Sequence, residues 1–214
     1  MTRPASALRA LLGTCLFLLP AGPAPVQAQS ASVVQVEEEW ELLVAEPDPK
    51  TVSPQVSCTL SPGKTLDGWY AVWTVNYGNI PDFVPGGMQL QLWSGSDCVN
   101  CVSLDNGQTL AHANEVVHWT LRMSKTADGL VFEVSNGSSL TWGNFGSSNV
   151  LRLSVPGYSG DLNNYSADLS AANAEVGFGG NRVVKLVLKR VRYTLSDGRV
   201  WEDTTPRTIH QLAQ

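Results

Sequence analysis

Apolar and polar residues alternate along most of the chain, which is typical of β-strands with one buried face. In the run 114–124, for example, Val117, Trp119, Leu121 and Met123 fall on one face. The same alternation recurs in four other runs, at 54–62, 68–78, 86–95 and 129–138. The regular period of two favours antiparallel strands, because such sheets bury only one of their faces.

Residues typical of turns separate these runs, in particular at 127–129, 135–139 and 196–199. Asp-Gly and Asn-Gly pairs at such positions favour hairpin connections. One long polar stretch, 154–175, is expected to cover an end of the fold, and helical periodicity is nearly absent. About a dozen short strands without helices predict an all-β protein, an antiparallel two-sheet β-sandwich.

The first 28 residues have the features of a signal peptide. Arg3 and Arg9 give the N-terminal end a positive charge, and an apolar stretch follows. Small residues before position 29 favour cleavage after Ala28. We therefore expect a secreted protein, extracellular or periplasmic. Its single sandwich domain would span 29–206, followed by a loosely held C-terminal tail, 207–214.

Charge narrows the set of partners. The net charge is −5, and loss of a signal peptide that contains two arginines and no acid would take it to −7. An acidic protein is poorly suited to bind nucleic acid or anionic membranes. We therefore expect neither as a partner.

Two stretches, 132–146 and 174–193, resemble the closing half of concanavalin A-like or laminin-G-like jelly-roll sandwiches. The segment 40–62 is similar to a group of bacterial secreted proteins with no assigned activity. The resemblance implies a concanavalin A-like jelly roll as the fold. It implies no particular function, since unrelated functions share such folds.

Catalytic residues of the related hydrolases are not recognisable. The laminarinase-like enzymes carry Glu-x-Asp-x-(x)-Glu on one strand, which sets two carboxylates on one face. Here the acidic cluster at 37–41 has no Asp in register, and Pro49 follows the pair Glu46 and Asp48. No cofactor is predicted. The short Asp/Asn loops 103–107 and 161–164 leave open whether the protein binds calcium.

Three cysteines would remain after cleavage: Cys58, Cys98 and Cys101. No helix follows the Cys-x-x-Cys pair, and no second ligand pair completes a zinc site, so neither redox nor zinc chemistry is favoured. We expect a Cys98–Cys101 disulfide across a tight turn. A bond from Cys58 to one of them, or no bond, are the alternatives, with Cys58 otherwise a buried thiol.

Trp93 is the candidate binding residue, because it shares a strand face with Gln89 and Gln91. An aromatic ring beside amides suits a sugar, whose C–H face stacks on the ring while its hydroxyls bind the amides. His118 and Arg122 would join this patch if their strand faced the same surface. Alternatively, Trp93 packs under the loop 94–104 on a solvated face.

The leading hypothesis is a secreted non-catalytic module that binds extracellular carbohydrate or a surface protein. A glycan-active hydrolase or lyase with unidentified catalytic residues is the second hypothesis. A structural or adhesion protein without a small ligand is the third.

Overall fold

The computed structural model describes residues 30–45, 54–77, 86–108, 110, 112–147 and 149–213. The predicted signal peptide lies outside the described residues. From Ala31 onward the chain belongs to one compact unit, Ala31–Gln214. Neither of the helices described, α1 (Ala167–Ala172) and the short 3-10 helix η1 (Gly180–Arg182), has the length and apolarity needed to cross a membrane.

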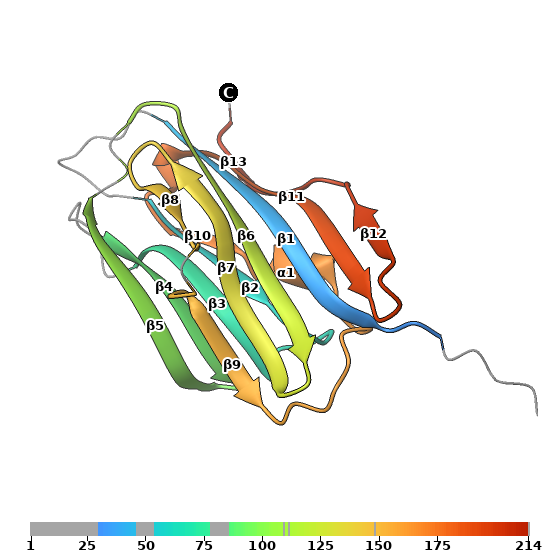
Figure 1. Ribbon diagram of the computed structural model, residues 1–214. Helices are drawn as coiled ribbons and strands as arrows, with labels where there is room; N and C mark the ends of the chain where they lie inside the picture. The colour runs from blue at the N-terminus through green and yellow to red at the C-terminus, as the bar shows by residue number, and fades with distance from the viewer. Residues whose placement is uncertain are drawn as a thin grey trace, which may run out of the picture. The chain divides into compact units, whose positions relative to one another are not determined.

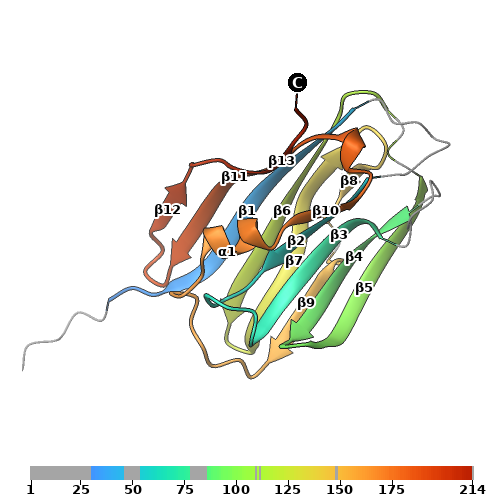
Figure 2. The same cartoon turned by 180° about the vertical axis from the view of Figure 1, so that it is seen from behind.

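The described strands form two antiparallel sheets packed against each other, as Figures 1 and 2 show from opposite sides. The larger sheet consists of β1 (Val33–Val44), β6 (Glu115–Thr126), β7 (Gly129–Ser139), β8 (Gly143–Phe145), β9 (Arg152–Pro156), β11 (Val183–Leu195), β12 (Val200–Asp203) and β13 (Arg207–Gln211). The smaller consists of β2 (Gln55–Leu60), β3 (Trp69–Tyr77), β4 (Gly86–Ser94), β5 (Asp97–Gln108) and β10 (Glu175–Phe178). The predicted all-β antiparallel sandwich is confirmed.

Strand order determines which side chains can meet. The larger sheet runs β12-β11-β1-β6-β7-β8, with β13 beside β11 and β9 beside β7. The smaller sheet runs β10-β2-β3-β4-β5, so that β5 and β10 are its edges. The first strand, β1, is therefore central in the larger sheet, where it pairs with β6 and β11.

The core lies between the sheets and consists of the apolar residues that the alternation assigned to inner faces. Trp40 and Trp119 stack there with ring centroids 6.4 Å apart and planes 7° apart. Trp73 is also fully buried, whereas Trp69 is half-buried at the margin of the core. Every second residue of β1, β2, β3, β4 and β6 points into this core.

Two segments fold differently from the prediction. The polar stretch 154–175 contains α1, a six-residue helix. Within the predicted tail 207–214, Arg207–Gln211 form β13, which pairs with β11 from Lys185↔Gln211 to Leu188↔Arg207, so these five residues are held in the larger sheet. Ile209 supplies a reason, because it is partly buried against the core.

Candidate functional site

The outer side chains described on β2, β3, β4 and the first half of β5 are uncharged. Directly opposed residues of antiparallel strands share a face, so the register arranges the outer side chains of β2–β5 in rows. The rows are Tyr70, Trp93 and Cys98; then Thr59, Val72, Gln91 and Cys101; then Ser57, Thr74, Gln89 and Ser103. These rows offer aromatic, hydroxyl, amide and thiol groups and no charge.

Trp93 and Tyr70 form an aromatic platform on this face. Their ring centroids are 6.1 Å apart and their planes differ by 8°. The Tyr70 hydroxyl donates a 3.0 Å hydrogen bond to the carbonyl oxygen of Gly95, which fixes the ring. Both side chains are half-buried, so part of each ring faces solvent. Trp93 thus lies where the alternation placed it, beside Gln89 and Gln91.

A chain of hydrogen bonds orients the amides next to this platform. Trp93 Nε1 donates to Gln91 Oε1 (3.2 Å), and Gln91 Nε2 donates to Gln89 Oε1 (2.7 Å). Gln89 Nε2 then donates to Ser103 Oγ at 3.0 Å. Because an indole N–H can only donate, Gln91 must accept from Trp93 with its oxygen, and this fixes which group donates in each of the following hydrogen bonds. The second N–H of Gln91 takes no part in this chain of hydrogen bonds, and Gln91 is half-buried, whereas Gln89 is buried.

The platform forms part of a groove of about 370 Å³. Its floor comes from outer side chains of β2, β3 and β4, and its wall from Leu66 and the segment 172–175. Glu175 is the one charged group among the described residues that line the groove. Its carboxylate accepts a long hydrogen bond, 3.4 Å, from the hydroxyl of Ser57.

The wall is held in place by α1, which the sequence analysis missed. Ser166 caps the helix by accepting a hydrogen bond from the Leu169 N–H at 3.3 Å. Asp168 lies in the first turn, where its negative charge interacts favourably with the positive end of the helix dipole. At the other end, the Asn173 carbonyl accepts from Thr59 Oγ1 at 3.1 Å, which ties the wall to β2. A Ser cap ahead of Ala, Asp and Leu is the signal that was available.

A buried carboxyl group fastens the segment around α1 to the larger sheet. Glu38 points into the core and is 0% exposed. It accepts hydrogen bonds from Trp40 Nε1 (2.9 Å) and the Tyr165 hydroxyl (2.7 Å), and it also hydrogen-bonds Ser170 of α1. Burial raises its pKa to about 7, although these hydrogen bonds and the charge of Arg207 act to lower it. Its proton therefore comes off near neutral pH.

The outer face of the larger sheet has the opposite chemistry. Its strands carry alternating charges that pair across the sheet, and Arg122 contacts both Glu37 and Glu133 in this lattice. Arg190 likewise contacts Glu39 and Glu202. Such a surface is satisfied by its own counter-charges, and individual exposed pairs contribute about 0–1 kcal/mol each.

His118 and Arg122 lie on this charged face and therefore do not join Trp93. Both belong to β6, a strand of the larger sheet, whereas Gln89, Gln91 and Trp93 belong to β4 of the smaller sheet. The condition on which they would join the patch of Trp93, a strand that faces the same surface, is therefore not met. Alternation along a strand determines which face a side chain takes but not which sheet the strand joins.

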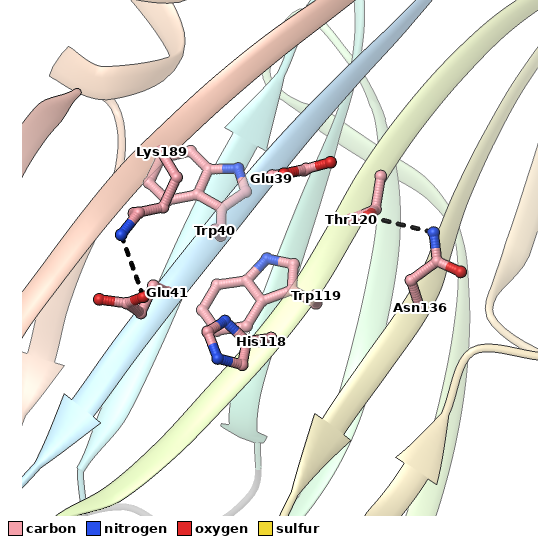
Figure 3. Close-up of a pocket in the computed structure, with 8 residues that line it drawn as sticks. All are labelled: Glu39, Trp40, Glu41, His118, Trp119, Thr120, Asn136 and Lys189. Atoms are coloured by element: carbon pink, nitrogen blue, oxygen red, sulfur yellow. Dashed lines mark hydrogen bonds and ion pairs between the residues drawn. The ribbon is translucent and has the colours of Figure 1, made fainter. Parts of the chain in front are cut away.

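His118 lines a shallow pocket of about 320 Å³, shown in Figure 3. Glu41, opposite His118 in the register, contacts Lys189 at 3.2 Å and Lys185 at 3.6 Å. Burial acts to raise the pKa of Glu41, but the Lys189 hydrogen bond and the two lysine charges outweigh it and hold the pKa below its ordinary value. A carboxylate neutralised in this way is poorly suited to be a catalytic acid.

The predicted Cys98–Cys101 disulfide is absent: both thiols are free and exposed, and Cys58 is free and buried. The residues 97–108 form one strand, β5, without the tight turn that the bond needs. Burial raises the pKa of the Cys58 thiol, as does the neighbouring Glu38, which keeps this thiol protonated.

No three His, Cys, Asp or Glu side chains converge as a metal site within the described part of the chain. No family model matches the sequence, and no curated protein matches it.

Proposed function

We propose that the protein is a secreted, non-catalytic module that binds extracellular carbohydrate in the groove over β2, β3 and β4. The aromatic platform of Tyr70 and Trp93 would stack on the apolar C–H face of a sugar ring. The remaining N–H of Gln91 would donate to a sugar hydroxyl, and Ser57 Oγ, whose own proton goes to Glu175, would accept from one. Export rests on the character of residues 1–28, and the jelly-roll resemblance is compatible with it.

The contrast between the two outer faces carries this proposal. A solvated face with no role is expected to resemble that of the larger sheet, where charges keep the surface hydrated. The smaller sheet instead presents stacked rings beside amides whose orientation is fixed in advance. Preorganised polar groups around an aromatic surface are the usual composition of a small-molecule site.

Glycoside hydrolysis has less support than binding. Both common mechanisms need two carboxylates, about 5–10 Å apart, around the scissile bond. Among the described residues that line the groove, Glu175 is the one carboxylate. The three outward carboxylates of β1, Glu37, Glu39 and Glu41, are each engaged by arginine or lysine on the other face.

Replacing Trp93 by alanine is expected to weaken glycan binding by at least about tenfold, because the stacking surface and the donor to Gln91 are lost together. The measurement is a titration of the full chain against a panel of neutral and acidic polysaccharides by calorimetry or affinity electrophoresis. The same titrations with and without calcium test the option that the Asp/Asn loops leave open.

Trp201→Ala is the matched control, because Trp201 is 57% exposed but lies on β12 of the other sheet. It should bind like the wild type, as should Arg122→Ala. Trp93→Phe, which keeps a ring but loses the N–H, should retain part of the affinity. Equal binding by Trp93→Ala and Trp201→Ala would refute the proposed site, and no binding across the panel would refute carbohydrate as the ligand.

A further inference from the structure

Among the strands that the structure describes, β5 is an edge of the smaller sheet with no partner on its far side. It pairs with β4 on one side and lies at the end of the strand order, and Figures 1 and 2 show it outermost from both directions. Its first half is exposed, from Asp97 to Cys101, and Val99 is 49% exposed. An exposed edge strand is a template for pairing with another strand.

A β-bulge brings the two exposed thiols of this edge onto one face. Cys98 pairs with Trp93 and Cys101 pairs with Gln91, with an irregularity between them that leaves Val99 as the extra residue. Residues three apart normally point to opposite faces of a strand. The extra residue cancels that offset, so both sulfurs lie on the outer face with Trp93 and Gln91.

We propose that the β5 edge binds a second copy of this chain, with Cys98 of each copy bonded to Cys101 of the other. In an antiparallel pair around a twofold axis between residues 99 and 100, Cys98 faces the partner's Cys101 and Cys101 faces the partner's Cys98. An unbulged strand forbids this register, because opposed residues must share a face. The bulge permits it, since both thiols already share one.

The same bulge makes the edge selective. A bulge on an edge strand disfavours pairing with a regular strand, because the extra residue shifts the register of the two strands on either side of it. Two copies carry the same bulge and advance equally, so Cys98 and Cys101 stay in register. Opposed residues of antiparallel strands have Cα atoms about 4.5–5.5 Å apart, within the range of about 4.4–6.8 Å that a disulfide needs.

Each bond forms by thiol–disulfide exchange with a small oxidised thiol such as glutathione disulfide. The Cys98 thiolate attacks one sulfur and releases a glutathione thiolate, which takes up a proton. The partner's Cys101 thiolate then displaces the second glutathione. Two such bonds consume two glutathione disulfides and release four glutathiones per dimer.

The dimer would join two smaller sheets into one continuous outer face. The two platforms of Tyr70 and Trp93 would lie on the same side, with the two β4 strands three spacings apart, roughly 14 Å. If the proposed glycan function holds, a polymer could occupy both grooves. Binding of a polymer would then be about 100-fold tighter for the dimer than for the monomer, whereas a single short oligosaccharide would bind both equally.

Pairs of single variants test the pairing directly. The chain from residue 29 onward, which lacks Cys15 and contains the whole compact unit Ala31–Gln214, is equilibrated with reduced and oxidised glutathione and measured by intact mass and non-reducing electrophoresis. We expect a dimer of two chain masses less four hydrogens, which dithiothreitol converts to monomer. Cys98→Ser and Cys101→Ser should each stay monomeric alone. Mixed one to one, they should give a heterodimer with one disulfide, because Cys101 of the first then faces Cys98 of the second.

Cys58→Ser is the control for general thiol loss and should dimerise normally, because Cys58 is buried. Homodimers of either single variant, an internal Cys98–Cys101 bond, or a chain that stays reduced would each overturn the inference. The outcome is independent of the glycan test. A dimer that binds no glycan would support this interface and refute the proposed function. A monomer that binds glycan would refute the interface and support the proposed function.

Discussion

Replacing Glu38 by glutamine is expected to stabilise the protein at pH 8 by up to about 3 kcal/mol, a rise in melting temperature of roughly 6–12 °C. Below about pH 4.5 the variant should lie within about 1 kcal/mol of the wild type, because the neutral acid and the amide have similar shape and hydrogen bonding. The measurement is thermal unfolding of both proteins across this pH range.

The sign follows from the direction of the pKa shift. The pKa of Glu38 is about 7 in the folded protein, against an ordinary value of 4.5. Its stabilising contribution is therefore fully present below 4.5 and is lost as the pH rises through 7. The amide has no proton to lose. Hydrogen bonds with Ser170, Tyr165 and Trp40 and the charge of Arg207 act to lower the pKa of Glu38. Glu38 in turn acts to raise the pKa values of its neighbours Cys58, Tyr165 and Tyr193.

Glu115→Gln is the matched control and should have the opposite effect at neutral pH. Glu115 is equally buried, but its two oxygens accept from the Thr141 N–H (2.7 Å) and Thr141 Oγ1 (2.6 Å). An amide at this position cannot make the charge-assisted hydrogen bonds that the carboxylate accepts from Thr141, and their loss should destabilise the protein by about 1–3 kcal/mol. A Glu38→Gln variant that is destabilised at every pH would contradict the account of Glu38.

Replacing Gly129 by alanine is expected to destabilise the protein by about 2–5 kcal/mol. Gly129 begins β7 at φ +146°, a region that other residues rarely adopt. An added Cβ would lie 2.1 Å from the carbonyl oxygen of Val155. That oxygen belongs to β9, which pairs with β7, so relief requires the two strands to separate. Chemical denaturation measures the loss.

Gly198→Ala separates the two causes. Gly198 also has a positive φ, +84°, but a Cβ there has no atom within 4 Å. Its substitution should therefore cost only the backbone strain, about 1 kcal/mol. Equal losses at the two glycines would show that the close contact with Val155 has no effect.

The strands and their inner faces were predictable because the physical pattern is local. In β4, Met88, Leu90 and Leu92 alternate with Gln89 and Gln91, and burial of alternate residues follows directly. The alternation therefore also predicts the outer face of β4, with Trp93 beside the amides of Gln89 and Gln91. It does not predict the partners of this strand, because pairing depends on contacts between distant segments. For that reason the sequence leaves open which surface His118 shares, and the sheet order places it on the larger sheet.

Other features escaped prediction for different reasons. The helix α1 is too short to show a helical period, and the bulge at Val99 depends on β4 as well as β5. The burial of Glu38 is consistent with the alternation, because Glu38 falls in phase with Val36 and Trp40 on the inner face of β1. It is hard to predict because the neighbouring glutamates make the run resemble an exposed acidic cluster.

The central position of β1 has a consequence for the order of folding. Its outer neighbour, β11, is nearly the last long strand to be synthesised, and Val33 pairs with Leu195. Until β11 emerges from the ribosome, one whole edge of β1 has no partner, and the larger sheet cannot close. Such long-range pairing makes folding slow and late. Most of the chain is therefore synthesised before the larger sheet can close, and its unpaired strand edges are prone to aggregation until then.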